Sequence, residues 1–322
     1  MRIIKNHSEI DATAWKKLVD SSPVATWFQT LEAYDFFASL PSMMTPFVFA
    51  VESNEKLKGL VVGYITREKN PIKQFFTRRA IIYGGPLLSE DISDEELKSL
   101  LFAICSFLKS KAIYIETRNF NDYNKWRNVF EQSGFTYQPH YDMHIDCGNY
   151  EKMISRIDER KYRQVSKEIN EVEFTEAHTI NEIKDFYLLL SDLYHRKVHT
   201  PLFPIEFFTA FVQQKRGVLL LVKRLGKVIG GMLCPMIKGK VIYEWFVVGP
   251  AVVTWSVMDY ANKNHFPLFD LMGAGKPDIP YGVRDFKMQF GGELKEYGRY
   301  LMINNKCLYN IGKIGVDVMK RS

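Results

Sequence analysis

The chain has 322 residues, of which 46% are apolar, 25% charged and 14% aromatic. This is the composition of an ordinary globular protein, and it argues against a disordered, collagen-like or low-complexity chain. At roughly 150 residues per domain, the length favours two domains. The 43 lysines and arginines against 37 acidic residues leave a net charge of +6, which favours anionic partners only weakly. A protein that coats nucleic acid would require a larger or more clustered positive charge.

The sequence predicts neither a membrane span nor a site built on cysteine or histidine. The longest apolar stretch, residues 228–237, is about half as long as a membrane helix, and the first residues lack a signal-peptide pattern. We therefore expect a soluble cytoplasmic protein. The cysteines at 105, 147, 234 and 307 lie far apart, which argues against a disulfide framework or a structural zinc site. His195 and His199 lack an acidic residue at the usual ligand position, so we expect no metal.

Strand and helix patterns alternate along the first half of the chain. Strands rich in β-branched and aromatic residues are predicted at 46–52, 56–65 and 80–88. Apolar residues recur at three-to-four spacing in 95–110, which predicts a helix, and a strand follows at 112–117. A second helix ends at 130–134, and a strand at 135–146 completes this half.

The second half repeats this order. It predicts strands and helices, in sequence, at 218–224, 227–237, 240–249, 254–264 (helix), 266–272, a short helix ending at 290–291, and 293–303. Both halves thus read β-β-β-α-β-α-β after leading helices, which indicates an α/β protein with mixed sheets of the α+β kind. We expect domains at 1–149 and 150–304, followed by a C-terminal helix at 305–322 that packs back on the body.

The repeated order resembles two acyltransferase domains of the GNAT fold in tandem, each with Lys-x-x-Gly opening its second strand, at 56–59 and 227–230. Further motifs narrow the resemblance to the Fem family. They are WFQT at 27–30, YEWF at 243–246, FDLMG at 269–273 and FKMQFG at 286–291, the most specific of the set. The resemblance runs over essentially the whole chain in order and implies two fused GNAT-like domains.

The Fem resemblance also implies a function. It implies transfer of an amino acid from aminoacyl-tRNA to an amine of a peptidoglycan precursor, either a UDP-linked or a lipid-linked muropeptide, or of a related glycoconjugate. It implies no cofactor, and a peripheral membrane contact through the lipid-linked substrate. Two other functions stay open: a CoA-dependent N-acyltransferase of polysaccharide or small-molecule metabolism, and a non-catalytic binding module in envelope assembly.

Lys287 is the first candidate catalytic residue. Aminoacyl transfer requires stabilisation of the oxyanion that forms at the ester carbonyl. Lys287 lies between Phe286 and Met288 and could place a cation in a dry setting, and in the Fem family the matching lysine is implicated in the reaction. The alternative is a surface lysine whose stem covers the core. Phe286 is expected to contact the substrate, and Arg284 either orients it or pairs with Asp285.

A basic helix is predicted at 151–169. Its cations recur at spacings of three and four, which places them on one face: Lys152, Arg156, Arg160, Arg163 and Lys167. Such a face suits the pyrophosphate of a nucleotide or lipid carrier, or a tRNA backbone, and the alternative is a solvated helix surface. Arg196 lies in a stretch where the Fem family carries contacts to substrate phosphates, and otherwise it stabilises a helix end.

Two further candidates lie on predicted strands. Tyr243 is on the strand that borders the acyl-transfer cleft of GNAT folds, so its hydroxyl either binds substrate or simply packs. Glu116 matches a position where the Fem family often keeps a carboxylate, and it could accept the proton of the attacking ammonium. Its alternative is an exposed acid at a strand end, paired with Arg118.

Coenzyme A is disfavoured by both halves. In GNAT folds its pyrophosphate binds backbone N–H groups of a glycine-rich loop at a helix N-terminus. The second half reads VGPAV at 248–252, where Pro250 has no N–H to donate. The first half offers YGGP at 83–86, again without the glycine-rich pattern.

Overall fold

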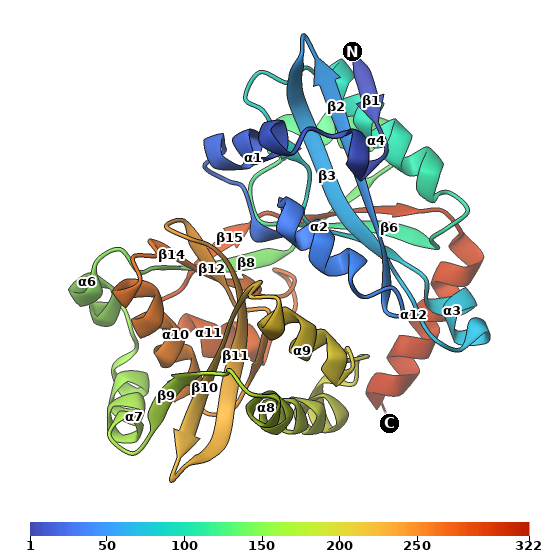
Figure 1. Ribbon diagram of the computed structural model, residues 1–322. Coiled ribbons are helices and arrows are strands. Elements are labelled where there is room, and N and C mark those ends of the chain that lie inside the picture. Colours follow the sequence, from blue (N-terminus) through green and yellow to red (C-terminus); the bar gives the residue numbers. More distant parts are fainter. Residues whose placement is uncertain (322) are drawn as a thin grey trace. The chain divides into compact units, whose positions relative to one another are not determined.

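The computed structural model describes residues 1–321, which form two compact units (Figure 1). Unit 1 comprises Met1–Pro139 together with the chain from Tyr297 onward, and unit 2 comprises His140–Glu296. Each unit holds a mixed sheet with helices, which confirms the predicted α/β class. None of the helices in residues 1–321 combines the length and the apolar character needed to cross a membrane.

The sheet of unit 1 has the strand order β1-β2-β3-β4-β6-β16-β7, and β5 pairs with β3. Among these described strands, β4 and β6 run parallel and the other neighbours are antiparallel. The strands are β1 (Arg2–Ile4), β2 (Met44–Ser53), β3 (Lys56–Thr66), β4 (Ala80–Gly84), β5 (Leu87–Leu88), β6 (Tyr114–Asn119), β7 (Thr136–Gln138) and β16 (Arg299–Ile303). The β2–β3 hairpin turns at Asn54 and Glu55, both left-handed, as a tight two-residue hairpin turn requires.

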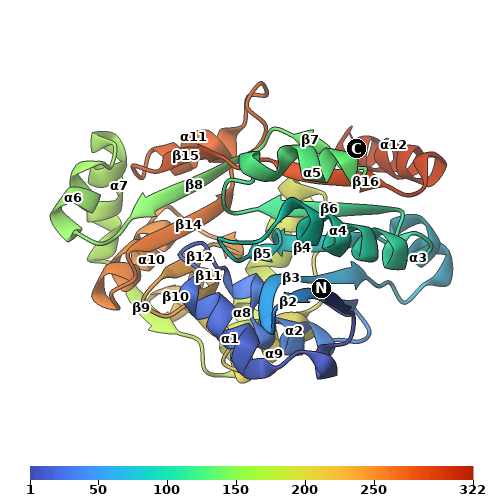
Figure 2. The same ribbon diagram turned by 90° about the horizontal axis from the view of Figure 1, so that it is seen from above.

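The helices of unit 1 are α1 (Ala12–Ser21), α2 (Leu31–Ala38), α3 (Pro71–Thr77), α4 (Asp94–Leu108), α5 (Arg127–Gln132) and α12 (Lys306–Arg321). The helix predicted at 95–110 is α4. It begins at a capping box, in which Ser93 and Glu96 satisfy each other's backbone N–H groups. Its apolar face lies in one buried cluster with Phe47 and Phe49 of β2, and α5 lies beside it (Figure 2). The spacing of its leucines therefore decided which face is buried.

The sheet of unit 2 has the order β15-β8-β14-β12-β11-β10-β9, and β13 pairs with β11. Here β12 and β14 are the parallel neighbours. The strands are β8 (Tyr141–Asp146), β9 (Glu173–Glu176), β10 (Gly217–Arg224), β11 (Lys227–Ile237), β12 (Val241–Tyr243), β13 (Phe246–Val248), β14 (Leu268–Gly273) and β15 (Glu293–Glu296). The long β10–β11 hairpin is visible in Figure 1, as is the β2–β3 hairpin of unit 1.

The helices of unit 2 are α6 (Tyr150–Ser155), α7 (Glu159–Ile169), α8 (Ile180–Leu193), α9 (Ile205–Gln213), α10 (Val252–Lys263) and α11 (Gly282–Met288), and a π-helical turn covers Tyr194–Val198. The basic helix predicted as continuous at 151–169 is broken. Asp158 ends the break, because its carboxylate accepts from the N–H groups of Arg160 and Lys161 and so caps α7. Its own N–H donates to the carbonyl of Gln289 at 2.9 Å, which fixes the corner between α6 and α7.

The bounds of the two units differ from the expected domains, because unit 2 begins with β8 and unit 1 takes β16 from the C-terminal part of the chain. The predicted strand 135–146 is two strands: β7 stays in the sheet of unit 1, and β8 joins the sheet of unit 2. The predicted strand 293–303 divides in the same way into β15 in unit 2 and β16 in unit 1. Residues 140–149 thus belong to unit 2, and residues 297–304 to unit 1.

Each unit also interrupts a strand that the sequence predicts as continuous. In unit 1 the break between β4 and β5 falls at Gly85 and Pro86, and both Gly85 and Gly84, the last residue of β4, have positive φ. In unit 2 the break between β12 and β13 falls at Glu244 and Trp245. There the N–H of Glu244 donates to Asp270 of β14, whereas that of Trp245 donates to Leu233 of β11. The backbone thus changes partner strand at this point.

Candidate functional site

Lys287 lies at the end of α11 and is buried, with 5% of its surface exposed. Its ammonium pairs with the carboxylate of Glu244 at 2.9 Å and donates to the carbonyl oxygen of Leu271. The carbonyl oxygen of Gly273 lies 3.4 Å away, a long and weak contact. Lys287 is therefore not a surface lysine: its charge is compensated inside unit 2, at the break between β12 and β13.

The residues around Lys287 explain the FKMQFG motif. Phe286 and Phe290 are four residues apart, so their rings lie on one face of the segment, 5.3 Å between centroids, and Phe290 is fully buried. Gly291 ends the turn with φ +77°, a conformation that suits glycine. A Cβ atom there would lie 2.6 Å from that of Arg156, so a side chain would clash with the α6–α7 corner.

Two buried acidic side chains lie at and beside the middle of β14. Across the sheet, Asp270 of β14 stands opposite Tyr243 of β12 and opposite His144 of β8. Asp142, also on β8, and Asp270 are both buried. Burial, and then the charge of Asp270, raise the pKa of Asp142 well above its usual range. Burial and these two carboxylates also raise the pKa of Tyr243.

The charges of this cluster do not balance if every group takes its usual form. The carboxylates of Asp142, Asp270 and Glu244 face the ammonium of Lys287. Burial raises the pKa of Glu244, and Lys287 opposes this shift. A proton held by Asp142 lowers the excess negative charge, because paired carboxylates in one buried place do not both ionise. Asp142, His144 and Asp270 also offer ligand atoms within 4.8 Å of one another, a donor set that a metal ion could use.

Glu116 of unit 1 lies between two arginines. Its carboxylate accepts from Nε of Arg118 at 3.0 Å and from Arg299 of β16 at 2.9 Å. Burial raises the pKa of Glu116, but the charges and hydrogen bonds of these arginines outweigh burial and lower it to about 2. Such a carboxylate accepts a proton poorly at neutral pH. It is paired with Arg118, as one alternative from the sequence had it, although it is partly buried rather than exposed.

Aromatic side chains extend this cationic cluster. Arg118 donates to the hydroxyl of Tyr83 at 2.7 Å, and Tyr83 stacks on Phe28 with 4.8 Å between ring centroids. Nearby, the glycines of the YGGP segment have their carbonyl oxygens occupied: the side-chain amide of Gln29 donates to both Gly84 and Gly85. The segment at 83–86 is thus the break in a strand, and its carbonyls anchor the WFQT motif.

Three other predicted site residues make their contacts with groups other than Lys287. Arg284 donates to the carbonyl oxygens of Lys276 and Ile279, at 2.7 and 2.8 Å, and so braces the loop before α11. Phe286 packs partly buried against the core of unit 2, with the ammonium of Lys161 4.9 Å from its ring centroid. Arg196, in the π-helical turn, pairs with Asp192 at 2.8 Å on the surface.

The predicted basic face is divided by the break before α7. Arg156 lies in the corner between α6 and α7, whereas Arg160 and Arg163 are exposed on α7. Arg163 lies 3.4 Å from Glu159, a surface pair of small energetic weight. The five cations therefore do not form one helical face, because Asp158 starts a new helix among them.

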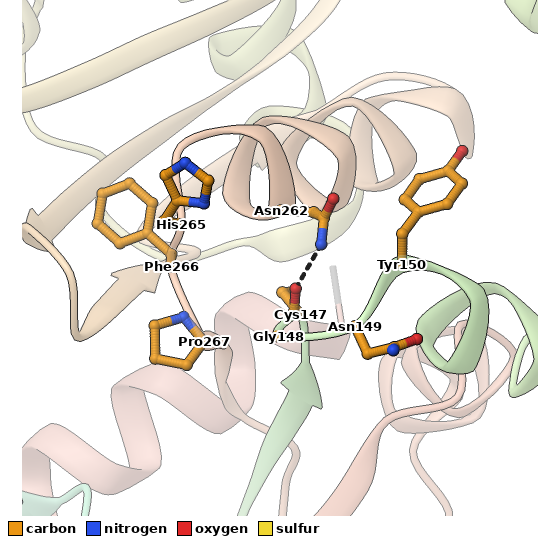
Figure 3. A pocket seen from close by; sticks show the side chains of 8 residues that line it. All are labelled: Cys147, Gly148, Asn149, Tyr150, Asn262, His265, Phe266 and Pro267. Carbon is orange, nitrogen blue, oxygen red and sulfur yellow. Dashed lines mark hydrogen bonds between the residues drawn. The ribbon is translucent and has the colours of Figure 1, made fainter.

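A cavity of about 430 Å³ in unit 2 lies at the end of α10 (Figure 3). Its lining residues are Cys147, Gly148, Asn149, Tyr150, Asn262, His265, Phe266 and Pro267. Its two asparagine side chains bond within the protein: Asn262 donates to the carbonyl of Cys147 at 2.8 Å, and Asn149 caps α6. Burial raises the pKa of the Cys147 thiol to about 12, so it is no nucleophile at neutral pH. None of the sequence-predicted site residues lines this cavity.

The helix N-termini that follow the interrupted strands offer little to a pyrophosphate. In unit 2, Pro250 lacks an N–H directly before α10. In unit 1 the corresponding helix is α4, whose first turn holds Asp94, Glu95 and Glu96, with Ser93 and Glu96 already filling the cap. These acids repel a phosphate group. The relevant segment of unit 1 is thus 89–94 rather than the predicted 83–86.

The sequence did not single out Glu244, Asp142, Asp270 or Arg299 as site residues. A signal for the acids was present, because charged residues interrupt otherwise apolar strands at LFDLMG and YDMHID. Arg299 gave no such signal: it meets Glu116 only because β16 pairs with β6 across 183 residues of sequence.

Neither a protein-family model nor a curated protein matches this chain in sequence. Solved structures match it over nearly its whole length. FemX superposes with a TM-score of 0.71 at 15% identity, covering 96% of this chain and 99% of FemX. A tandem GNAT protein from the clavulanic acid biosynthesis pathway superposes with a TM-score of 0.59 at 9% identity, covering 94% of this chain and 99% of that one.

A third similar structure is the C-terminal domain of a protein from Agrobacterium fabrum described as a lysylphosphatidylglycerol synthetase. It superposes with a TM-score of 0.57 at 13% identity, and covers 98% of this chain and 97% of its own. At such identities the likeness establishes the fold, since one fold hosts many chemistries. The chain therefore has the Fem-like tandem GNAT fold that its motifs predicted.

Proposed function

We propose that this protein is an aminoacyltransferase that moves an amino acid from aminoacyl-tRNA to an amine of a peptidoglycan precursor or a related glycoconjugate. The observation that carries the proposal is the buried ammonium of Lys287 at the interrupted strand of unit 2. The likeness to FemX over nearly all of both chains supports it as an analogy of fold.

The bonding of Lys287 suits stabilisation of an oxyanion. Glu244 and the Leu271 carbonyl hold the ammonium in place, so it need not reorganise during the reaction. The 3.4 Å contact with Gly273 is the one that a carbonyl oxygen of the substrate would replace. As the acceptor amine attacks the ester carbon, negative charge grows on that oxygen, and burial strengthens its attraction to the ammonium. The tRNA ribose oxygen then leaves as the ester bond breaks, and it takes up the proton that the attacking amine releases.

The helix N-termini support an aminoacyl-tRNA donor over coenzyme A. Pro250 removes an N–H before α10, and the acids of the first turn of α4 disfavour a pyrophosphate there. An aminoacyl-tRNA carries its phosphates on the nucleic acid and requires no such loop. We include Tyr243 as a substrate contact and Arg156, Arg160 and Arg163 as phosphate contacts in this proposal. We leave Glu116 out of it as proton acceptor, because its pKa is lowered to about 2.

The test is a transfer assay with radiolabelled aminoacyl-tRNA and muropeptide acceptors, with acetyl-CoA as a second donor. The Lys287→Met variant removes the ammonium, and Lys287→Met combined with Glu244→Gln also removes the carboxylate that it would leave unpaired. Lys295→Met is the matched control, because Lys295 pairs with Glu293 near the surface of the same unit.

We expect the parent to transfer the amino acid from aminoacyl-tRNA. In both Lys287 variants the transfer rate should fall about a hundredfold to a thousandfold, mainly in kcat, and in the control it should be unchanged. Transfer from acetyl-CoA alone would contradict the donor assignment. A folded double variant with activity within about threefold of the parent would contradict the role of Lys287.

A further inference from the structure

Apolar side chains lie exposed on two neighbouring helices of unit 1. On α3, Ile72, Phe75 and Phe76 stand at positions i, i+3 and i+4 and so share one face, and Ile72 is 72% exposed. On α12, Ile311 and Ile314 are three residues apart, and Ile314 is 64% exposed. We call these residues the α3–α12 surface.

The two helices lie side by side (Figures 1 and 2). A Cβ atom at Gly312 would lie 3.8 Å from the carbonyl oxygen of Phe76, an ordinary contact distance, so this turn of α12 lies against the end of α3. Leu308, one turn before Ile311, is buried. α12 thus buries Leu308, while Ile311 and Ile314 remain in solvent.

Single exposed apolar residues are common and need no explanation, but a contiguous group marks an interaction surface. Here the group combines aromatic and aliphatic side chains of large size.

Basic residues accompany the apolar group. Along the two segments they are Arg67, Lys69, Lys73 and Arg78 around α3, and Lys306 and Lys313 on α12. Glu68, the acid in this part of the α3 segment, already pairs with Lys73 at 3.2 Å. Arg78 places its guanidinium 4.9 Å from the ring centroid of Phe75, so cation and apolar surface are contiguous. An apolar face with a Lys- and Arg-rich polar side is the pattern of helices that lie in a membrane interface.

We propose that the α3–α12 surface binds peripherally to an anionic phospholipid membrane. Its isoleucine and phenylalanine side chains enter the region between headgroups and acyl chains, and its lysines and arginines contact lipid phosphates. A second copy of the chain fits less well, because it would bring two sets of cations together at close range. The proposal is independent of the reaction proposed above.

The test is sedimentation of the full chain with vesicles of phosphatidylglycerol and phosphatidylcholine in equal parts, compared with vesicles of phosphatidylcholine alone. The triple variant Ile72→Ser, Phe75→Ser, Ile314→Ser removes the apolar contacts. Phe102→Ser is the matched control, because Phe102 of α4 is also 72% exposed and belongs to the same unit. Circular dichroism verifies that each variant folds.

We expect the parent to bind the anionic vesicles. The triple variant should bind them at least about tenfold more weakly, and the control should bind within about twofold of the parent. The double variant Lys69→Gln, Lys73→Gln should weaken binding to the anionic vesicles but not to vesicles of phosphatidylcholine alone, and added salt should have the same effect. Equal sedimentation of parent and folded triple variant would overturn the proposal. The proposal would also be overturned if the parent did not bind vesicles but formed a dimer in light scattering, and if the triple variant abolished that dimer. The α3–α12 surface would then bind a second copy of the chain.

Discussion

The two units share one strand pattern, but the acid at the same place in it has neighbours of opposite charge. Glu116 lies on β6, the second strand of the parallel pair of unit 1, and Asp270 lies on β14, the second strand of the parallel pair of unit 2. Arginines surround Glu116 and lower its pKa to about 2. Around Asp270, burial and a second carboxylate instead raise the pKa of Asp142.

The strands that lie beside the parallel pairs, β16 in unit 1 and β8 in unit 2, account for much of this difference. Arg299 reaches Glu116 from β16, and Asp142 and His144 reach Asp270 from β8. Each of these strands comes from a distant part of the chain and lies next to the parallel pair. The repeated fold thus determines where a polar cluster forms. The strand beside the parallel pair determines whether the strand acid meets cations or further acids. Substitutions in the two clusters should therefore respond differently to pH.

The largest effect is expected for Lys287→Met. The change leaves the carboxylate of Glu244 buried without its cation, so we expect a loss of about 3 to 5 kcal/mol in the free energy of unfolding at neutral pH. Adding Glu244→Gln should restore most of it. The loss should shrink at acidic pH, where Glu244 takes up a proton, and urea unfolding followed by circular dichroism measures both. If Lys287→Met were as stable as the parent, the ion pair of Lys287 and Glu244 would not be buried in solution.

Glu116→Gln should have the next largest effect. It removes the carboxylate shared by Arg118 and Arg299, and we expect a loss of about 2 to 4 kcal/mol, reduced because both guanidinium groups are a quarter exposed. The pKa of Glu116 is lowered from 4.5 to about 2, so its contribution is complete above pH 4.5 and is lost as pH falls through about 2. The difference between variant and parent should narrow over that window. Glu90→Gln, an exposed acid of the same unit, is the control.

Asp142→Asn should raise the free energy of unfolding, whereas the two substitutions above lower it. It keeps the shape and the oxygen that accepts from the N–H of Met143, and removes a carboxylate whose pKa the fold raises. The folded parent holds a proton that the unfolded chain has released, so the stability of the parent falls as pH rises above the usual range of Asp. We expect the variant to gain on the order of 1 to 3 kcal/mol at neutral pH, with a larger gain at higher pH.

Thermal unfolding of Asp142→Asn beside the exposed control Asp278→Asn measures this gain. Addition of Zn²⁺ or Mn²⁺ separates the two ways of balancing the cluster. If Asp142 and Asp270 share a proton, the ions leave the unfolding temperature of the parent unchanged. If the ions stabilise the parent and not the variant, the Asp142, His144 and Asp270 donor set is a metal site.

The smallest effect on stability is expected for Arg160→Gln with Arg163→Gln. Both side chains are exposed on α7, so the free energy of unfolding should change by no more than about 0.5 kcal/mol. If they contact substrate phosphates, binding of aminoacyl-tRNA should weaken and its salt dependence should flatten by roughly one unit of slope per contact. Filter binding at several salt concentrations tests this, and an unchanged slope would leave α7 with a solvated surface.

Local patterns in the sequence predicted most of the elements and the repeated order. Ser93 and Glu96 mark the start of α4, and alternating or continuous apolar runs mark β2, β3, β10 and β11. These signals involve residues within a few positions of one another, where capping and side-chain periodicity act directly. The repeat of the order, with its motifs, was enough to predict the tandem fold.

The tertiary structure decided what these patterns cannot encode. The predicted strands at 135–146 and 293–303 each look continuous, and their halves separate only because different sheets offer them partners. Lys287 could equally have covered the surface, but the β12–β13 break buries it against Glu244. The pKa of Glu116 is lowered by Arg118, which lies two residues away, and further by Arg299, which strand pairing brings to it across 183 residues. Burial and charge at a site depend on such distant neighbours, and no local pattern specifies them.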